Sequence, residues 1–237
     1  LVQSDELKWI RNDIILERDS IYFDFSASGL ESRTVANRMQ SILGRYANTH
    51  SANSRNANFI DELYKSAKIR LKELLDLSED FFVIPSGYGA SGAMKKYQEI
   101  KGLYLPPKLR AILGDSIRNV QKKCVLVGGY EHHSNDISLR EAFCDLVRIP
   151  LKNGLMSLDS IESLLDSQKI DFSSINIASN VSGIIAPYAQ ISNILRQKNI
   201  DIAFDLAALS PHSNVECALF DSAFLSPHKL VGGIGSC

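Results

Sequence analysis

The chain has 237 residues, of which 45% are apolar and 22% charged, and its 26 Lys and Arg against 27 Asp and Glu give a formal net charge of −1. This length allows a sizeable core, and the composition is ordinary for a globular protein. The balanced charge leaves no basic footprint for nucleic acid or anionic lipid, and no apolar run is long enough to span a bilayer, so we expect neither partner.

The N-terminal stretch and the cysteines bear on the compartment. "LVQSDELKWIRND" alternates charges where a secretory signal would be apolar. The four cysteines are widely scattered and form no C-x-x-C pair, so neither a zinc site nor a disulfide framework is predicted; they are Cys124, Cys144, Cys217 and Cys237. We therefore expect a cytoplasmic protein.

Helical and strand patterns alternate along the chain from residue 58 onward. Residues 58–77 show helical spacing of apolar side chains between charges, with a stripe of Phe59, Leu63, Ala67, Leu71 and Leu74. "FFVI" at 81–84 predicts a short buried strand, followed by a glycine-rich turn and a helix over 92–100.

The second half of the chain continues this alternation. Strands are predicted at 124–129, 146–151, 174–179, 201–207 and 221–226, with helices at 157–168 and 189–199. Ser157 is the expected N-cap of the first of these helices, with Asp159 in its positive first turn. The pattern predicts an α/β fold whose mostly parallel central sheet is flanked by helices.

Unusual residues follow the predicted strands. Glycines at 87–92 come after "FFVI", "EHH" at 131–133 after "CVLVGG", and Asn180 after "INIAS"; Asp205 ends "DIAF", and "HK" at 228–229 comes after "AFLS". Because ligands on such sheets bind beyond the carboxyl ends of the strands, we expect these five points to share one edge.

The glycine turn "SGYGASGA" satisfies G-x-G-x-x-G through Gly87, Gly89 and Gly92, and this is the pattern of a dinucleotide-binding site. Such a site needs an acidic residue about twenty positions on, at the end of a strand. That region is "YLPPKLRAILGD", where Pro106 and Pro107 oppose a strand. A phosphate bound to the N–H groups that open the helix is the better prediction, and a plain tight turn is the alternative.

Two other signals have structural alternatives. "EHHSND" suggests a metal, but adjacent histidines on an extended segment point to opposite faces, so we disfavour it; one imidazole can instead lie against an aromatic ligand. Asp205 interrupts the apolar run "IAFDLAAL", so its carboxylate needs hydrogen bonds from the fold or a ligand cation. Lys229, taken alone, is an ordinary surface lysine.

Taken together, these residues supply what pyridoxal phosphate requires. The set holds a phosphate cradle, a stacking ring, a carboxylate for a ring nitrogen, an amide and a lysine amine. Asp205 would keep the pyridine nitrogen protonated, and Lys229 would form the Schiff base and, once released, serve as the base for the α-proton.

Six motifs in order resemble the class V aminotransferase family of fold-type I pyridoxal-phosphate enzymes, above all its cysteine desulfurases. They are "IYFDFSASGL", "YANTHS", "YEHHSN", "ASNVSGIIAPYAQI", "AFDLAALSPH" and "FLSPHKLVGGIG", and they run across nearly the whole chain. The resemblance implies residues 1–22 as an N-terminal segment and 23–237 as the three-layer large domain that binds the cofactor. The chain would lack the small domain. It would therefore also lack the arginine that binds the substrate carboxylate and the cysteine that desulfurases use, which lie further along the chain in the family.

The resemblance also implies a role for each matched position. Lys229 is the Schiff-base lysine, and Asp205 is the partner of the pyridine nitrogen. His132 would stack on the cofactor ring and take part in catalysis, and Asn180 would bind near the phenolic oxygen of the cofactor. The phosphate would be bound by Ser226 and His228 and by the backbone of Gly89 and Ala90. His50 would lie on the substrate side. Ala208 stands where the family has a glutamine.

The implied activity is removal of sulfur from cysteine to give alanine, in a homodimer that hands sulfur to an acceptor protein. An aminotransferase or lyase acting on another amino acid is the first alternative. A truncated or degenerate pyridoxal-phosphate-binding protein without turnover is the second, and we expect this fragment alone to be inactive.

Overall fold

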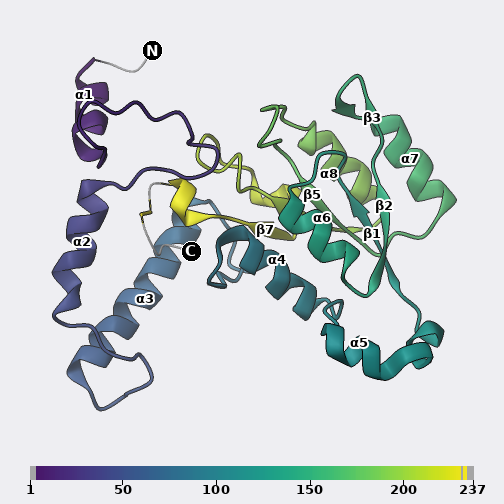
Figure 1. Ribbon diagram of the computed structural model, residues 1–237, viewed down its shortest axis with the longest axis horizontal. Helices are drawn as coiled ribbons and strands as arrows, with labels where there is room; N and C mark the ends of the chain where they lie inside the picture. Colours follow the sequence, from purple (N-terminus) through teal and green to yellow (C-terminus); the bar gives the residue numbers. More distant parts are fainter. Residues whose placement is uncertain (1–3, 231, 234–237) are drawn as a thin grey trace. The chain divides into compact units, whose positions relative to one another are not determined.

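The computed structural model describes residues 4–230, 232 and 233 (Figure 1). The chain divides into two compact units, which we call unit 1 (residues 1–84 and 227–237) and unit 2 (residues 85–226). The chain therefore passes from unit 2 back into unit 1 directly after Ser226.

Unit 1 is helical, with α1 (Ser4–Asp13), α2 (Arg33–Leu43), α3 (Arg55–Leu74) and the 3-10 helix η3 (Pro227–Leu230). Serine N-caps begin α2 and α3: Ser32 Oγ accepts from Val35 N at 3.2 Å, and Ser54 Oγ accepts from Ala57 N at 3.3 Å.

The helix expected over 58–77 is present as α3, but its apolar stripe is not buried in a core. Ala57 is the buried residue of this helix. Leu74 is 57% exposed, and Phe59 carries the guanidinium of Arg45 over its ring, 3.4 Å from the centroid.

The strand predicted at 81–84 is wrong. Residues 81–86 have no regular secondary structure, and Phe82 is 86% exposed. The aromatic and branched side chains gave this run its strand character, but no other strand of the described chain pairs with it. The glycine turn that follows does open a helix, as predicted.

Unit 2 contains every named strand, five helices and two 3-10 helices. The helices are α4 (Gly89–Ile100), α5 (Pro107–Leu113), α6 (His133–Arg140), α7 (Leu158–Ser167) and α8 (Tyr188–Gln197), with η1 (Gly114–Asn119) and η2 (Cys217–Leu219). The strands are β1 (Lys123–Val127), β2 (Cys144–Arg148), β3 (Leu151–Lys152), β4 (Leu155–Met156), β5 (Phe172–Asn176), β6 (Asp201–Asp205) and β7 (Ser222–Phe224). Pro107 opens α5 at a first-turn position, as a helix tolerates, and Ser157 caps α7 as predicted.

Five strands form one sheet in the order β2-β1-β5-β6-β7, and every pairing in it is parallel. Strands β3 and β4 form a separate antiparallel hairpin. In register, Asp205 at the end of β6 lies between Asn176 at the end of β5 and Phe224 at the end of β7. The carboxyl ends of the strands therefore meet at one edge of the sheet.

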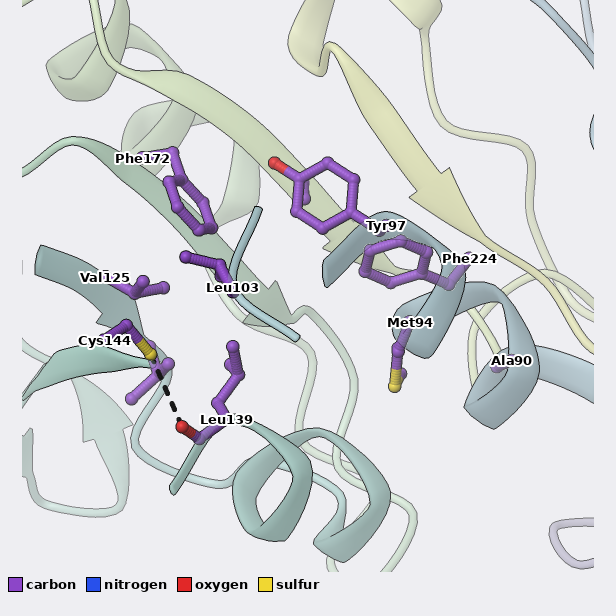
Figure 2. Packing of buried hydrophobic residues seen from close by; sticks show 11 residues of the cluster. Ala90, Met94, Tyr97, Leu103, Val125, Leu139, Cys144, Phe172 and Phe224 are labelled. Carbon is purple, nitrogen blue, oxygen red and sulfur yellow. Dashed lines mark hydrogen bonds between the residues drawn. The ribbon is translucent and has the colours of Figure 1, made fainter. Parts of the chain in front are cut away.

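Helices cover both faces of this sheet, so the predicted mostly parallel sheet flanked by helices is confirmed (Figure 1). One face packs on α4 and α6 through a buried cluster that Figure 2 shows: Ala90, Met94, Tyr97, Leu103, Val125, Val127, Leu139, Cys144, Phe172, Ala203 and Phe224. Because side chains alternate along a strand, Phe204 points to the other face, where its ring meets Tyr188 of α8.

Two expectations concern absences. No helix in the described part of the chain has both the length and the apolar character that crossing a bilayer requires. Cys124, Cys144 and Cys217 are free, while Cys237 lies outside the described residues.

Candidate active site at the carboxyl edge of the sheet

A serine hydroxyl and a helix start meet at this edge. Ser226 follows β7 and is buried, and its Oγ accepts a hydrogen bond of 3.0 Å from the backbone N–H of Ala90 in the first turn of α4. The side chain of Tyr88, at the N-cap position, caps nothing. Gly89 N–H donates to the Gly87 carbonyl at 2.9 Å, so the first two N–H groups of α4 have acceptors within the protein, and the positive dipole end of the helix is the feature that suits an anion.

Glycine is required where the chain turns into α4. Gly87 and Gly89 have φ values of +88° and +59°, which L side chains rarely adopt. A Cβ on Gly92 would lie 2.7 Å from the carbonyl oxygen of Ser86. The glycines of "SGYGASGA" therefore serve the turn and the close approach of the helix to it.

Asp205 supplies a buried carboxylate at the same edge. It ends β6 with 2% of its surface exposed, and its Oδ1 accepts from Ala207 N at 2.9 Å. An ionised carboxylate in such a place needs donors or a cation. The hydrogen bond from Ala207 orients the Asp205 carboxylate at the point where β6 ends and the following loop begins.

His132 lies between β1 and α6, as the N-cap of α6. Its Nδ1 accepts from the backbone N–H of Ser134 at 3.2 Å, which leaves the ring proton on Nε2. The expectation that His132 and His133 point to opposite faces is wrong, because their ring centroids are 4.1 Å apart. The segment turns into a helix here instead of continuing extended.

Within residues 4–230, 232 and 233, no group of three or more His, Cys, Asp or Glu is arranged to hold a metal ion.

A pair of serines joins the His132 turn to the start of α4. Ser91 Oγ donates to Ser134 Oγ at 2.7 Å, and Ser134 Oγ lies 3.1 Å from Nδ1 of His132. The sequence interpretation missed this link, although Ser91 belongs to "SGYGASGA" and Ser134 to "EHHSND".

A second carboxylate, that of the half-buried Glu131, was also missed as a site residue. Its Oε1 accepts from Gly128 N and from Asn176 N, each at 2.8 Å, and its Oε2 accepts from Asn135 Nδ2 at 2.7 Å. Burial raises the pKa of Glu131 to about 7, and the charge of Asp205 adds to the rise, while the three hydrogen bonds lower it. In the sequence, the only indication that Glu131 belongs to the site was its position directly after a predicted strand.

Asn180 lies at an exposed turn after β5. Ser179 closes this turn: its carbonyl accepts from Gly183 N at 2.9 Å, and its Oγ accepts from Val181 N and Ser182 N. The turn presents the Asn180 side chain to solvent in unit 2.

The remaining predicted residues lie in unit 1. Lys229 and His228 are half-buried in η3, and the His228 carbonyl accepts from Gly29 N at 3.0 Å. A Cβ on Gly29 would lie 2.8 Å from that carbonyl oxygen, so the glycine of "FSASGL" allows the first motif to touch the last. His50 is exposed in a turn, where its N–H donates to Asn48 Oδ1 at 2.8 Å.

The structure thus brings one group of predicted residues to the carboxyl edge of the sheet in unit 2. This group contains Asp205, Ser226, Gly89, Ala90 and His132, with Asn180 in the turn after β5. Lys229, His228 and His50 belong to unit 1.

One family model covers the part of the chain that forms this sheet. The family model described as "Aminotransferase class-V" matches residues 111–236, more than half of the chain. The chain belongs to the class V aminotransferase family.

Within this family the similarity is to cysteine desulfurases. A protein named "Probable cysteine desulfurase" from Halalkalibacterium halodurans is 23% identical over 223 residues, which cover 91% of this chain and 51% of that protein. Solved structures of similar fold include the following two. One is the apo cysteine desulfurase of Thermococcus onnurineus NA1 (TM-score 0.75, 19% identity, 96% of this chain and 55% of that one), and the other is a NifS-like protein of Rickettsia africae ESF-5 (0.72, 20%, 91% and 56%). The chain spans about half the length of these relatives.

Proposed function

We propose that the chain carries the cofactor-binding part of a pyridoxal-phosphate enzyme that acts on an amino acid, with cysteine desulfurase chemistry. The observation that carries this is the juxtaposition in unit 2 of the Ser226–Ala90 hydrogen bond with the buried carboxylate of Asp205 on the neighbouring strand. The first is suited to a phosphate and the second to a protonated ring nitrogen.

The chemistry of the donors supports a phosphate at the start of α4. The Ser226 hydroxyl accepts from Ala90 N–H and can turn its own proton toward an anion at the positive end of α4. The backbone of Gly89 and Ala90, whose N–H groups donate to the Gly87 carbonyl and to Ser226, would line the phosphate. His228, two residues beyond Ser226 in the chain, would add a side-chain donor.

The burial of Asp205 supports a cationic partner. A carboxylate held away from water by its surroundings favours a positive group that reaches it, because the local dielectric strengthens their attraction. Ala207 N–H occupies Oδ1 and holds the carboxylate in one orientation. Asp205 would in this way keep a pyridine nitrogen protonated.

The remaining residues would hold the cofactor and handle the proton. Lys229 would bind it covalently through its amine and, once released, take the α-proton of the substrate, while His132 would lie against the ring and Asn180 would donate to its phenolic oxygen. When bound, pyridoxal phosphate supplies an electron sink for the bond that breaks at the α-carbon.

The choice of cysteine as substrate is supported by the names of the relatives. A probable cysteine desulfurase matches most of this chain, and a cysteine desulfurase shares its fold. In the proposed reaction cysteine loses its sulfur to give alanine, and a homodimer passes the sulfur to an acceptor protein. His50 would lie on the substrate side.

Absorbance spectroscopy tests the cofactor. Pyridoxal phosphate added to the 237-residue chain should produce a yellow species that survives dialysis. Lys229→Ala should abolish it, and Lys152→Ala, which changes an exposed lysine in the β3–β4 hairpin, should leave it unchanged. A wild-type chain that stays colourless, or a Lys229→Ala chain that colours equally, would argue against the proposal.

Product analysis tests the reaction. The polypeptide extended to the length of its relatives, supplied with cysteine and a thiol reductant, should give alanine and sulfide, because the thiol reduces the sulfane sulfur that leaves cysteine to sulfide. Transfer of the amino group to a keto acid without sulfide would instead favour an aminotransferase. Tight cofactor binding without turnover of any amino acid would favour the degenerate binding protein, for which Ala208 in place of the family glutamine is the supporting observation.

A further inference from the structure

We propose that Glu131 is a positioning residue that fixes the His132 ring at the carboxyl edge of the sheet; its importance for the cofactor rests on the function proposed above. Glu131 directly precedes His132 and lies in the connection between β1 and α6. Its carboxylate bonds to both ends of that connection and to the neighbouring strand.

Both carboxylate oxygens are used, and each of their three donors comes from a different element. Gly128 N stands at the end of β1, Asn176 N at the end of β5, and Asn135 Nδ2 in the first turn of α6. All three groups donate, so both oxygens of the carboxyl group serve as acceptors. We call this arrangement the Glu131 clamp.

Asn135 is itself oriented, so its amide presents donors to Glu131. It is buried, its Oδ1 accepts from Ser174 Oγ at 3.2 Å, and its Nδ2 donates to the Ser174 carbonyl at 3.4 Å as well as to Glu131. A reversed amide would place its oxygen against both the Ser174 carbonyl and the Glu131 carboxylate. The amide orientation is therefore fixed by β5.

The chain leaves space for the clamp by having glycine at 128. A Cβ there would collide with Glu131 Oε1 and would lie 2.7 Å from Met156 Cε. The close approach of the carboxylate to the β1 end thus requires a residue without a side chain.

The clamp acts on His132 through the backbone on both sides. Gly128 and Asn135 bracket the histidine, and both are tied to the same carboxylate, so the N-cap conformation of His132 (φ −63°, ψ 142°) is held from either end. The hydrogen bond from Ser134 N to Nδ1 then sets the rotation and the tautomer of the ring. A ring that stacks on a ligand must be held in this way before the ligand arrives.

A purely structural role, a tie between β1 and β5, is the competing explanation, and the same two strands provide the matched control. At the other end of this strand pair, Asp171 Oδ2 accepts from Cys124 N at 2.8 Å. Asp171→Asn therefore disturbs a hydrogen bond from carboxylate to backbone between the same two strands, at the end of the strands that is distant from His132.

The test uses histidine-ring ¹⁵N NMR on the 237-residue chain without cofactor, with the His132 signals assigned through a His132→Asn variant. The wild-type chain should show an unprotonated Nδ1 and a protonated Nε2 on His132. In Glu131→Gln the amide NH2 group faces the Asn135 amide, so the clamp opens, and we expect the two nitrogen shifts to move toward each other as the ring samples other states. Asn135→Ala, which keeps both backbone bonds of Glu131, should give the same change to a smaller degree and serves if Glu131→Gln does not fold. Asp171→Asn should leave the His132 signals as in the wild type.

Unchanged His132 signals in the clamp variants, or an equal change in Asp171→Asn, would overturn the proposal. A second measurement is the dissociation constant for pyridoxal phosphate, which should rise about tenfold in Glu131→Gln and stay constant in Asp171→Asn. If the wild-type chain binds no pyridoxal phosphate, the proposed function fails, while the NMR comparison still decides the role of Glu131.

Discussion

The hydroxyl of Ser226 and the backbone N–H of Ala90 are 136 positions apart in sequence and share a buried hydrogen bond of 3.0 Å. This bond joins the end of β7 to the first turn of α4. It connects Ser226, directly after β7, to the glycine turn, two parts of unit 2 that the sequence predicted only to lie at the same edge of the sheet.

Ser226→Ala should destabilise unit 2 and weaken the binding of phosphate-bearing ligands. The change leaves the Ala90 N–H buried without an acceptor, which costs about 1–3 kcal/mol in the free energy of unfolding. The matched control is Ser210→Ala, because Ser210 Oγ is buried without a partner among the described residues, so its removal should be neutral or stabilising. Chemical denaturation measures both, and equal losses in the two variants would contradict this account.

Asp205→Asn should keep the fold but lower the affinity for pyridoxal phosphate by about 10- to 100-fold. The amide oxygen can still accept from Ala207 N, but the negative charge that would face a ring nitrogen is lost, and a charged hydrogen bond contributes about 1.5–3 kcal/mol. Asp221→Asn is the control, since Asp221 Oδ2 accepts from Ile202 N at 2.7 Å near the opposite end of β6. Cofactor titration should separate them; equal affinities for the two variants would count against the role of Asp205.

The stability of the protein should depend on pH through Glu131. Its pKa is raised from 4.5 in the unfolded chain to about 7 in the folded one, so the folded state binds the proton more tightly. The stabilisation from this group is full below pH 4.5 and is lost as the pH rises through 7. The difference corresponds to about 3 kcal/mol, an order-of-magnitude figure.

Denaturation of the wild type and Glu131→Gln from pH 4 to pH 8 measures this effect. The free energy of unfolding of the wild type, relative to the variant, should fall across that range, because glutamine does not titrate. Asp205 and Tyr130 are the titratable groups whose charges couple to Glu131. A difference that rises with pH would show that the carboxyl is ionised more easily in the folded chain.

Gly92→Ala should destabilise the turn into α4. The new methyl group would lie 2.7 Å from the Ser86 carbonyl oxygen, and since that atom is backbone, the turn itself must shift, at a cost of about 1–3 kcal/mol. Gly44→Ala is the comparison, because Gly44 has φ −65° with no atom within 4 Å of the added carbon. Thermal unfolding should show a loss for the first variant and none for the second.

The sequence predicted those parts of the fold in which local pattern and tertiary environment agree. Strands β1, β5, β6 and β7 overlap the predicted runs because each lies in a short stretch that carries buried apolar side chains and is bounded by polar residues. The buried position of Asp205 was likewise predicted by its apolar neighbours.

Two local patterns misled the interpretation. "FFVI" has the composition of a strand but lacks a pairing partner in the described chain, and pairing is a property of the whole sheet. The two adjacent histidines were treated as extended, but His132 caps a helix that begins at His133, which brings their rings together. The resemblance to the family assigned His132 without requiring that local geometry.

The role of Glu131 could not be predicted from the sequence, because its partners do not form a local pattern. Asn176 donates through its backbone, and a backbone N–H leaves no trace in residue type. Gly128 was visible as a glycine, but only the three-dimensional structure shows that a side chain there would meet the carboxylate.

The Glu131 clamp also has a consequence for how the chain reaches its native state. Asn176 follows Glu131 by 45 positions, and the β3–β4 hairpin and α7 lie between them. During synthesis the carboxylate therefore leaves the ribosome well before its partner on β5, and the loop must close over that distance before the bond can form. Until then nothing from β5 holds the His132 turn, so it matures only when the centre of the sheet has assembled.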